Sequence, residues 1–231
     1  MGLNDFIVKE ARPLPVFILA DVSGSMEGEK IRLLNTSIRE MISSLAGIDD
    51  LRGRFQVGII TFGEEVKIHQ PLSDVDAITL TEMRASGRTP MGEAFNIITS
   101  IIEDKDQISS RAYTPTIVLV SDGLPTDFNG HSNGTMSEYL EWEALKQLHA
   151  APRASKCLRL AMGIGSDADI NMLKAYINNP DIPVIRSKAA AGISNFFKWV
   201  TMSTVSRMSS ADPNAALSML PIGFENDEII L

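Results

Sequence analysis

Cysteine is almost absent from this chain of 231 residues, which contains only Cys157. A single thiol excludes an internal disulfide and a metal site built from several thiolates, and it is typical of a small buried residue in a reducing compartment. Histidine is also scarce. None of the three histidines lies beside an acid at the carboxyl end of an expected strand; they are His69, His131 and His149. The sequence therefore does not indicate a serine–histidine hydrolase.

Positive charge and long apolar runs are also in short supply. Lysine plus arginine number 21 against 29 acidic residues, a net charge of −8, which argues against a nucleic-acid partner and against attraction to anionic membranes. No apolar run approaches the ~18 residues of a membrane-spanning helix. The apolar run at 13–20 contains Pro13 and Pro15 and ends in Asp21 rather than at a cleavage site, so we expect a buried strand there and no secretory signal.

Apolar runs and helical periodicity alternate along the chain and predict an α/β fold. We expect a Rossmann-like, doubly wound, mostly parallel sheet with one antiparallel edge strand and helices on both faces. Residues 1–208 form the expected domain, and 209–231 form a tail with two prolines and no lysine or arginine. The expected strands are 14–20, 54–62, 66–72 (the antiparallel edge), 114–121, 158–163 and 183–186, and the expected helices are 29–46, 91–103, 137–150, 169–176 and 190–208.

Polar residues follow three of these segments where a ligand site is expected. In an open parallel sheet, ligands bind at the carboxyl ends of the strands. Oxygen ligands without nitrogen or sulfur suit Mg²⁺, Ca²⁺ or Mn²⁺. The candidate metal ligands come from "DVSGS", "SGRTP" and "SDG", and they are Asp21, Ser23, Ser25, Thr89 and Asp122.

Other interpretations of these motifs remain open at this point. Each alone is weak, because Asp and Ser also cap helices and "SDG" also forms turns. "GIGSDA" at 163–168 echoes a dinucleotide-binding fingerprint, but it follows a late strand and precedes a short helix. An enzyme of the haloacid dehalogenase type needs a second acid where Ser23 stands. The alternative to a binding module without catalysis is a magnesium-dependent phosphohydrolase or phosphotransferase that uses Asp21 or Asp122. An assay of phosphoester turnover would separate the enzyme from the binding module.

The segments "DVSGSM", "GRTPMGEA" and "SDGLPTD", in this order, resemble the metal-ion-dependent adhesion site (MIDAS) of von Willebrand factor A (VWA) domains. The resemblance covers roughly residues 14–208 and is strongest to the intracellular bacterial branch that includes the tellurium-resistance TerY proteins. It implies that Ser23 and Ser25 bind the cation directly, that Asp21 and Asp122 act mostly through water, and that Thr89 binds in either way.

The same resemblance implies the function. The sixth coordination position would accept an Asp or Glu of a partner protein, which makes the chain an interaction module rather than an enzyme. Mg²⁺ is the expected cation, with Mn²⁺ and Ca²⁺ as alternatives, and kinase-like or phosphatase-like proteins are the expected partners in a cytoplasmic stress response. Many relatives have Gly-Gly-Thr where this chain has Gly87-Arg88-Thr89. The Arg88 guanidinium would help to hold an acidic partner or would point to solvent.

Overall fold

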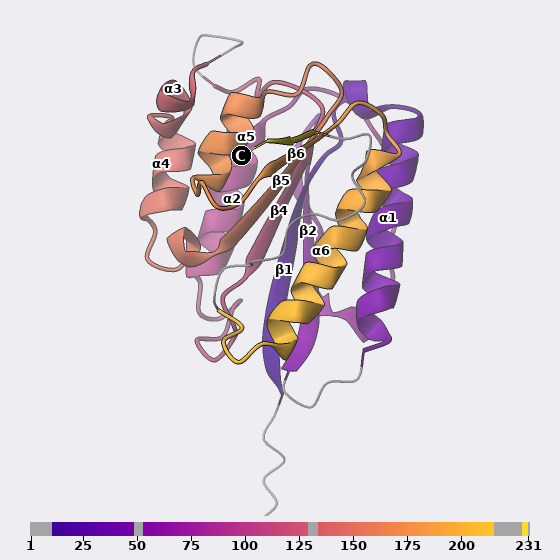
Figure 1. The fold of residues 1–231 in the computed structure, drawn as a ribbon, viewed down its shortest axis with the longest axis vertical. Helices are drawn as coiled ribbons and strands as arrows, with labels where there is room; N and C mark the ends of the chain where they lie inside the picture. The colour runs from indigo at the N-terminus through magenta and orange to yellow at the C-terminus, as the bar shows by residue number, and fades with distance from the viewer. Residues whose placement is uncertain (1–10, 49–52, 129–133, 215–227, 231) are drawn as a thin grey trace, which may run out of the picture.

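The computed structural model describes residues 11–48, 53–128, 134–214 and 228–230, which form one sheet flanked by helices (Figure 1). Among these residues the sheet has seven strands in the order β3-β2-β1-β4-β5-β6-β7. The strands are β1 (Arg12–Asp21), β2 (Gly53–Phe62), β3 (Val66–Asp74), β4 (Thr116–Ser121), β5 (Leu158–Ile164), β6 (Val184–Ser187) and β7 (Glu228–Ile230).

Parallel pairing dominates the sheet, which confirms the expected fold class. β2, β1, β4, β5 and β6 pair in parallel, and β3 runs antiparallel to β2 at one edge. β7 runs antiparallel to β6 at the other edge, with Val184 opposite Ile230, and this second antiparallel strand was not expected from the sequence. It comes from the tail at 209–231, of which residues 215–227 and 231 lie outside the described residues.

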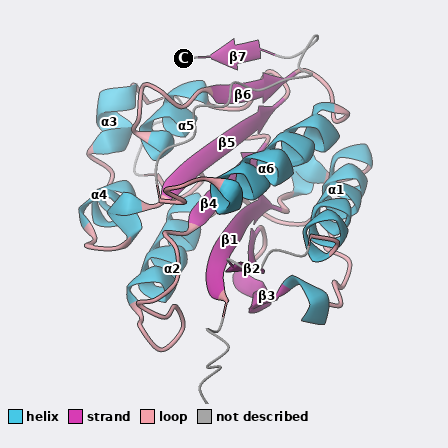
Figure 2. Ribbon diagram, turned by 60° about the horizontal axis from the view of Figure 1, so that its bottom comes forward, coloured by secondary structure: helices cyan, strands magenta, loops and turns pink. Residues whose placement is uncertain are grey.

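Helices cover both faces of the sheet. α1 and α6 lie together on one face, and α2, α3, α4 and α5 lie on the other (Figures 1 and 2). None of the described helices is long and apolar enough to cross a membrane. The helices are α1 (Glu29–Ala46), α2 (Met91–Glu103), α3 (Met136–Leu140), α4 (Glu143–Ala150), α5 (Ile170–Ile177) and α6 (Gly192–Ser209).

The prediction of a single helix at 137–150 is wrong, because the chain forms the two helices α3 and α4 there. Trp142 separates them with an extended backbone, φ −65° and ψ 125°. Its ring packs edge-on against Phe95 and Phe128, with centroid distances of 5.8 and 5.4 Å, and lies so close to Gly92 that a Cβ there would be 2.4 Å from the indole. Aromatic packing between elements therefore outweighs the local helical periodicity.

The central strands are buried on both faces. All six residues of β4 and all seven of β5 are buried, as is β1 from Leu14 to Asp21. This explains why these strands appear in the sequence as continuous apolar runs rather than as alternating patterns. Since both faces are covered, polar groups gather at the two ends of the strands.

Candidate metal centre

The carboxyl ends of β1 and β4 place two aspartates next to each other. The two strands are parallel neighbours, with Ala20 opposite Val120, so Asp21 and Asp122 both lie at the end of this pair. Both side chains are inaccessible to solvent or nearly so, with residue exposures of 0% and 3%. The topology therefore converges two acids that are about a hundred positions apart in the sequence.

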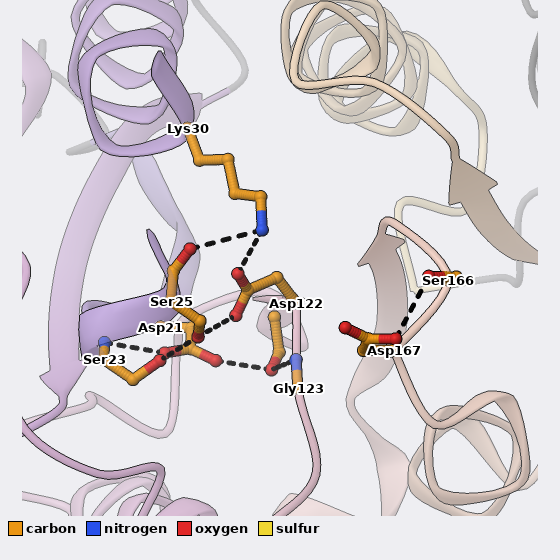
Figure 3. A network of polar contacts seen from close by, with 9 residues as sticks. Asp21, Ser23, Ser25, Lys30, Asp122, Gly123, Ser166 and Asp167 are labelled. Atoms are coloured by element: carbon orange, nitrogen blue, oxygen red, sulfur yellow. Dashed lines mark hydrogen bonds and ion pairs between the residues drawn. The ribbon is translucent and has the colours of Figure 1, made fainter. Parts of the chain in front are cut away.

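The loop after β1 connects these acids through its serine hydroxyls (Figure 3). The Asp21 Oδ1 atom accepts the Ser23 N–H at 2.8 Å, which shapes the start of the turn. The Ser23 and Ser25 hydroxyl oxygens lie 3.0 Å apart, and the Ser25 hydroxyl donates to Asp122 Oδ1 at 2.7 Å. Four of the five predicted ligands thus form one connected network. Ser25 is exposed, so the network opens to solvent on its side.

Thr89, the fifth predicted ligand, is buried against the loop that carries Asp122. Its N–H donates to the Thr126 hydroxyl at 3.2 Å, and its carbonyl accepts the Thr126 N–H at 2.9 Å. Its Oγ1 atom lies 3.9 Å from the position that a Cβ on Gly123 would occupy. The Thr89 hydroxyl makes no hydrogen bond to any described residue, which leaves both of its lone pairs free for a ligand.

Backbone contacts fix the loop of Thr89 against the loop after β1. The Ser86 N–H donates to the Val22 carbonyl at 2.7 Å, and the Gly24 N–H donates to the Gly87 carbonyl at 3.1 Å. Gly87 has a φ of +78°, and a Cβ there would lie 2.3 Å from Glu64 Cα. Only glycine fits this close approach, which holds the two loops together. Arg88, the predicted partner-binding residue, is exposed and forms no ion pair with a described residue.

Ser121 belongs to the network, although the sequence analysis did not identify it. Its hydroxyl donates to Asp21 Oδ2 at 2.5 Å and accepts the Gly123 N–H at 3.3 Å. Ser121 is the last residue of β4, and the parallel register with β1 puts it beside Asp21. This register was the signal that could have identified it.

Lys30 is the second residue that the sequence analysis missed. Its ammonium nitrogen lies 2.5 Å from Asp122 Oδ2 and 3.2 Å from the Ser25 carbonyl oxygen. Lys30 is the second residue of α1, and its side chain is 31% exposed. Its place in the first turn after "DVSGSMEG" was the available signal. In this structure an ammonium group supplies the positive charge beside the Asp122 carboxylate.

Burial disfavours the ionised form of the Asp21 carboxyl. Loss of solvation raises the pKa of this carboxyl from 3.8 to about 6, although hydrogen bonds from Ser121 and Ser23 lower the pKa, and the nearby charge of Asp122 raises it further. A divalent cation at this position would supply the opposite charge that the buried carboxylate lacks.

The donor set fits a hard cation. Two carboxylates and two serine hydroxyls form one network, and the Thr89 hydroxyl lies near Gly123, the residue after Asp122. No group of three or more His, Cys, Asp or Glu side chains suited to a metal occurs in the described part of the chain. All of the candidate ligands are oxygens, the preferred ligands of Mg²⁺, Ca²⁺ and Mn²⁺. The hydroxyls are neutral, so a cation bound here would retain much of its charge.

The two described histidines hydrogen-bond to backbone carbonyls away from the candidate ligands. His69 Nε2 lies 3.0 Å from the Thr81 carbonyl oxygen, and His149 Nε2 lies 3.2 Å from that of Tyr176. Neither forms a hydrogen bond to a candidate ligand, and His131 lies outside the described residues. The serines of the centre thus have no histidine base among the described residues.

Comparisons with known proteins relate this chain to one domain family. The family model of the von Willebrand factor type A domain matches residues 16–124, which contain all five candidate ligands. A search of curated proteins found no match.

Solved structures share the fold at low sequence identity. A von Willebrand factor type A protein from Catenulispora acidiphila is 18% identical (TM-score 0.61), with 84% of this chain and 42% of that protein covered. The ArnB paralog VWA2 from Sulfolobus acidocaldarius is 19% identical (TM-score 0.59), with 84% and 46% covered. Proximal thread matrix protein 1 from the mussel byssus, with a zinc-occupied MIDAS motif, is 16% identical (TM-score 0.59), with 83% and 48% covered.

The chain thus spans less than half the length of each of these three proteins. At such identities the likeness concerns the fold, whereas the match at 16–124 concerns the sequence itself. Residues 16–124 match the family model of the von Willebrand factor type A domain, and the described chain shares the fold of solved structures of such domains.

Proposed function

We propose that this chain is a metal-dependent protein-interaction module. Asp21, Ser23, Ser25, Thr89 and Asp122 would hold one divalent cation, and the partner would supply a carboxylate as a further ligand. The observation that carries the proposal is the continuous polar network from Asp21 through both serines to Asp122, with Ser25 exposed at its rim. The bound cation would supply positive charge at a surface opening.

The composition of the ligands favours partner binding over tight storage of metal. Neutral hydroxyls leave the charge of a cation poorly compensated, so an external Asp or Glu would complete the site. A charge-assisted contact of this kind contributes about 1.5–3 kcal/mol. The exposed Arg88 guanidinium lies next to Thr89 in the chain, where it would attract the same acidic partner.

We propose binding without catalysis. Haloacid dehalogenase-type chemistry needs an acid two residues after the first aspartate, and this chain has Ser23 there. The hydroxyl of Ser23 cannot act as a general acid at neutral pH. The absence of a histidine beside either serine, among the described residues, argues against a serine nucleophile as well.

The finer assignments rest on the resemblance of the three loop motifs. Mg²⁺ is the proposed cation because all five ligands are oxygens and because it is abundant, with Mn²⁺ and Ca²⁺ as alternatives. The TerY-type branch is the proposed family branch, with a cytoplasmic role in tellurium or other stress resistance. Kinase-like or phosphatase-like proteins are the proposed partners.

A double variant tests the proposal. Ser23→Ala with Ser25→Ala removes two direct ligands from a loop and leaves the apolar core unchanged. Wild-type protein on a solid support should retain specific proteins from a native lysate in Mg²⁺ and release them in chelator, and the double variant should retain none of them. Circular dichroism checks the fold, and Cys157→Ser is the control because Cys157 lies just before β5, at the end of the sheet opposite the metal centre. Equal retention by the folded double variant, or retention that persists in chelator, would contradict the proposal.

A further inference from the structure

A polar hollow lies at the end of the sheet opposite the candidate metal centre. It encloses about 270 Å³ where β5 begins and where α5 connects to β6. The residues lining it in the described part of the chain include Lys156, Arg159 and Arg207 but no aspartate or glutamate. Three basic side chains without an acid are unexpected in a chain whose net charge is −8.

Arg207, near the end of α6, is buried with an exposure of 3% and binds only neutral groups. Its Nε donates to the Pro213 carbonyl at 3.0 Å, Nη1 donates to the Thr116 hydroxyl at 2.5 Å, and Nη2 donates to the Thr114 carbonyl at 2.9 Å. These bonds occupy three of the five N–H donors of a guanidinium. One N–H on each terminal nitrogen has no partner among the described residues.

Arg159, the second residue of β5, has the same character. It is 8% exposed, its Nε donates to the Ile177 carbonyl at 3.1 Å, and its Nη1 donates to the Ala154 and Ser155 carbonyls at 3.3 Å each. Both N–H donors of Nη2 therefore have no partner among the described residues. The two guanidiniums are held in place by backbone carbonyls, and neither forms an ion pair with a described carboxylate.

Uncompensated buried charge is costly, which makes this pair unusual. Buried charged groups are normally paired with an opposite charge or with a metal. Burial lowers the pKa of Arg207 to about 10 and lowers the pKa of Arg159, yet both remain protonated at neutral pH. Asp212 is the carboxylate whose charge acts on Arg207, but its side chain is engaged with the Asn214 N–H at 3.0 Å.

Additional donors surround the two guanidiniums. The exposed Lys156 ammonium lies on the rim, and three asparagines, Asn178, Asn179 and Asn214, also line the hollow. The Asn214 carbonyl oxygen accepts the Thr114 N–H at 2.8 Å, and the Asn179 carbonyl oxygen accepts the Asp181 N–H at 2.9 Å. In both cases the oxygen of the side-chain amide is occupied, whereas its NH₂ group has no partner among the described residues.

From these donors we infer that the hollow at the amino end of β5 is a binding site for a phosphate-type oxyanion. A tetrahedral dianion accepts several hydrogen bonds at once, and the remaining N–H donors of the two guanidiniums, on both terminal nitrogens of Arg207 and on Nη2 of Arg159, would supply them. The site is separate from the candidate metal centre, which lies at the carboxyl ends of β1 and β4, and does not depend on a cation there.

Titration with inorganic phosphate tests the inference. The full chain is titrated by calorimetry in the presence of EDTA, so that no divalent cation at the metal centre can attract phosphate, with chloride at matched ionic strength as the reference. We expect saturable binding of one phosphate per chain and none of chloride. A parallel titration with phosphoserine separates the two sources: tighter binding of phosphoserine assigns the site to phosphate esters, and tighter binding of phosphate assigns it to the free anion.

Substitutions locate the site. Lys156→Gln alters an exposed side chain and should weaken phosphate binding about two- to fivefold, the usual range for one exposed charge. Lys67→Gln makes the same charge change on β3, at the far edge of the sheet, and should have no effect. Arg159→Met should abolish phosphate binding, provided that circular dichroism shows this variant to be folded. If Arg159→Met does not fold, the comparison of Lys156→Gln with Lys67→Gln decides the test. No saturable phosphate binding, or equal weakening by Lys156→Gln and Lys67→Gln, would overturn the inference.

Discussion

The two ends of the sheet bury charges of opposite sign. At the carboxyl ends of β1 and β4, the described residues bring two buried aspartates together with three serines and one ammonium group. At the amino ends of β4 and β5, two buried guanidiniums bind carbonyls and a hydroxyl, without a carboxylate among the described residues. Because helices cover both faces of the sheet, its ends are where polar chemistry can reach solvent. The contrast indicates a cation site at one end and an anion site at the other.

The largest expected effect concerns Asp21 in metal-free protein. Its pKa is raised from 3.8 to about 6 by burial, so the folded state binds this proton more tightly than the unfolded state does. The free energy of unfolding should therefore fall as the pH rises from about 4 to about 6, by ~3 kcal/mol at most. Urea unfolding in chelator measures this.

Two controls sharpen that experiment. Asp21→Asn removes the titrating group, so its stability should lose this part of the pH dependence. Saturating Mg²⁺ should also flatten the curve of the wild type, because a cation favours the ionised carboxylate. Identical pH profiles for wild type and Asp21→Asn would show that folding does not raise the pKa of Asp21.

At the amino end, Arg207→Met should lower the free energy of unfolding by about 1–3 kcal/mol. The change deprives the buried Thr116 hydroxyl and the partly buried Thr114 and Pro213 carbonyls of their donor, and acceptors left unpaired in the interior are costly. Arg111→Met, at an exposed arginine, is the control and should alter stability little. Urea unfolding decides the matter, and a more stable Arg207→Met variant would mean that burying this guanidinium costs more than its hydrogen bonds return.

A smaller effect is expected for Lys30→Met at the carboxyl end. Its ammonium lies 2.5 Å from Asp122 and would repel a divalent cation bound there. We expect Mg²⁺ to bind roughly three- to tenfold more tightly to this variant at low ionic strength, with a smaller gap in high salt. Lys67→Met is the matched control. Weaker Mg²⁺ binding in Lys30→Met would instead mean that Lys30 holds Asp122 in its ligating position.

The sequence predicted much of the fold because its signals were local. Helix α1 begins and ends at the predicted residues, since Leu34, Ile38, Met41 and Leu45 recur at helical spacing and are all buried. β1 and β4, whose ends carry the metal centre, appeared as continuous apolar runs because both of their faces are buried. Asp-x-Ser-x-Ser and Asp122 were recognisable because each follows directly after such a run.

The missed features depend on contacts between distant segments. The break at Trp142 comes from aromatic rings in other elements, and β7 depends on pairing with β6. Arg207 contacts Thr116 across 91 positions, and Lys30 contacts Asp122 across 92. Arg207 belongs to no local motif, and although Lys30 lies close to "DVSGS" in the sequence, the topology decides which carboxylate it contacts.

Binding of Mn²⁺ to a matched pair of variants tests the central claim most directly. Asp122→Asn and Asp167→Asn remove the same charge from neighbouring loops, but the side chain of Asp167 accepts the Ser166 hydroxyl and takes no part in the network of Asp122 (Figure 3). By calorimetry, the wild type should bind one Mn²⁺. Asp122→Asn should bind it roughly ten- to a hundredfold more weakly, and Asp167→Asn should match the wild type within about twofold. Equal affinities for the two variants, or no saturable binding to the wild type, would contradict a metal centre at the carboxyl ends of β1 and β4.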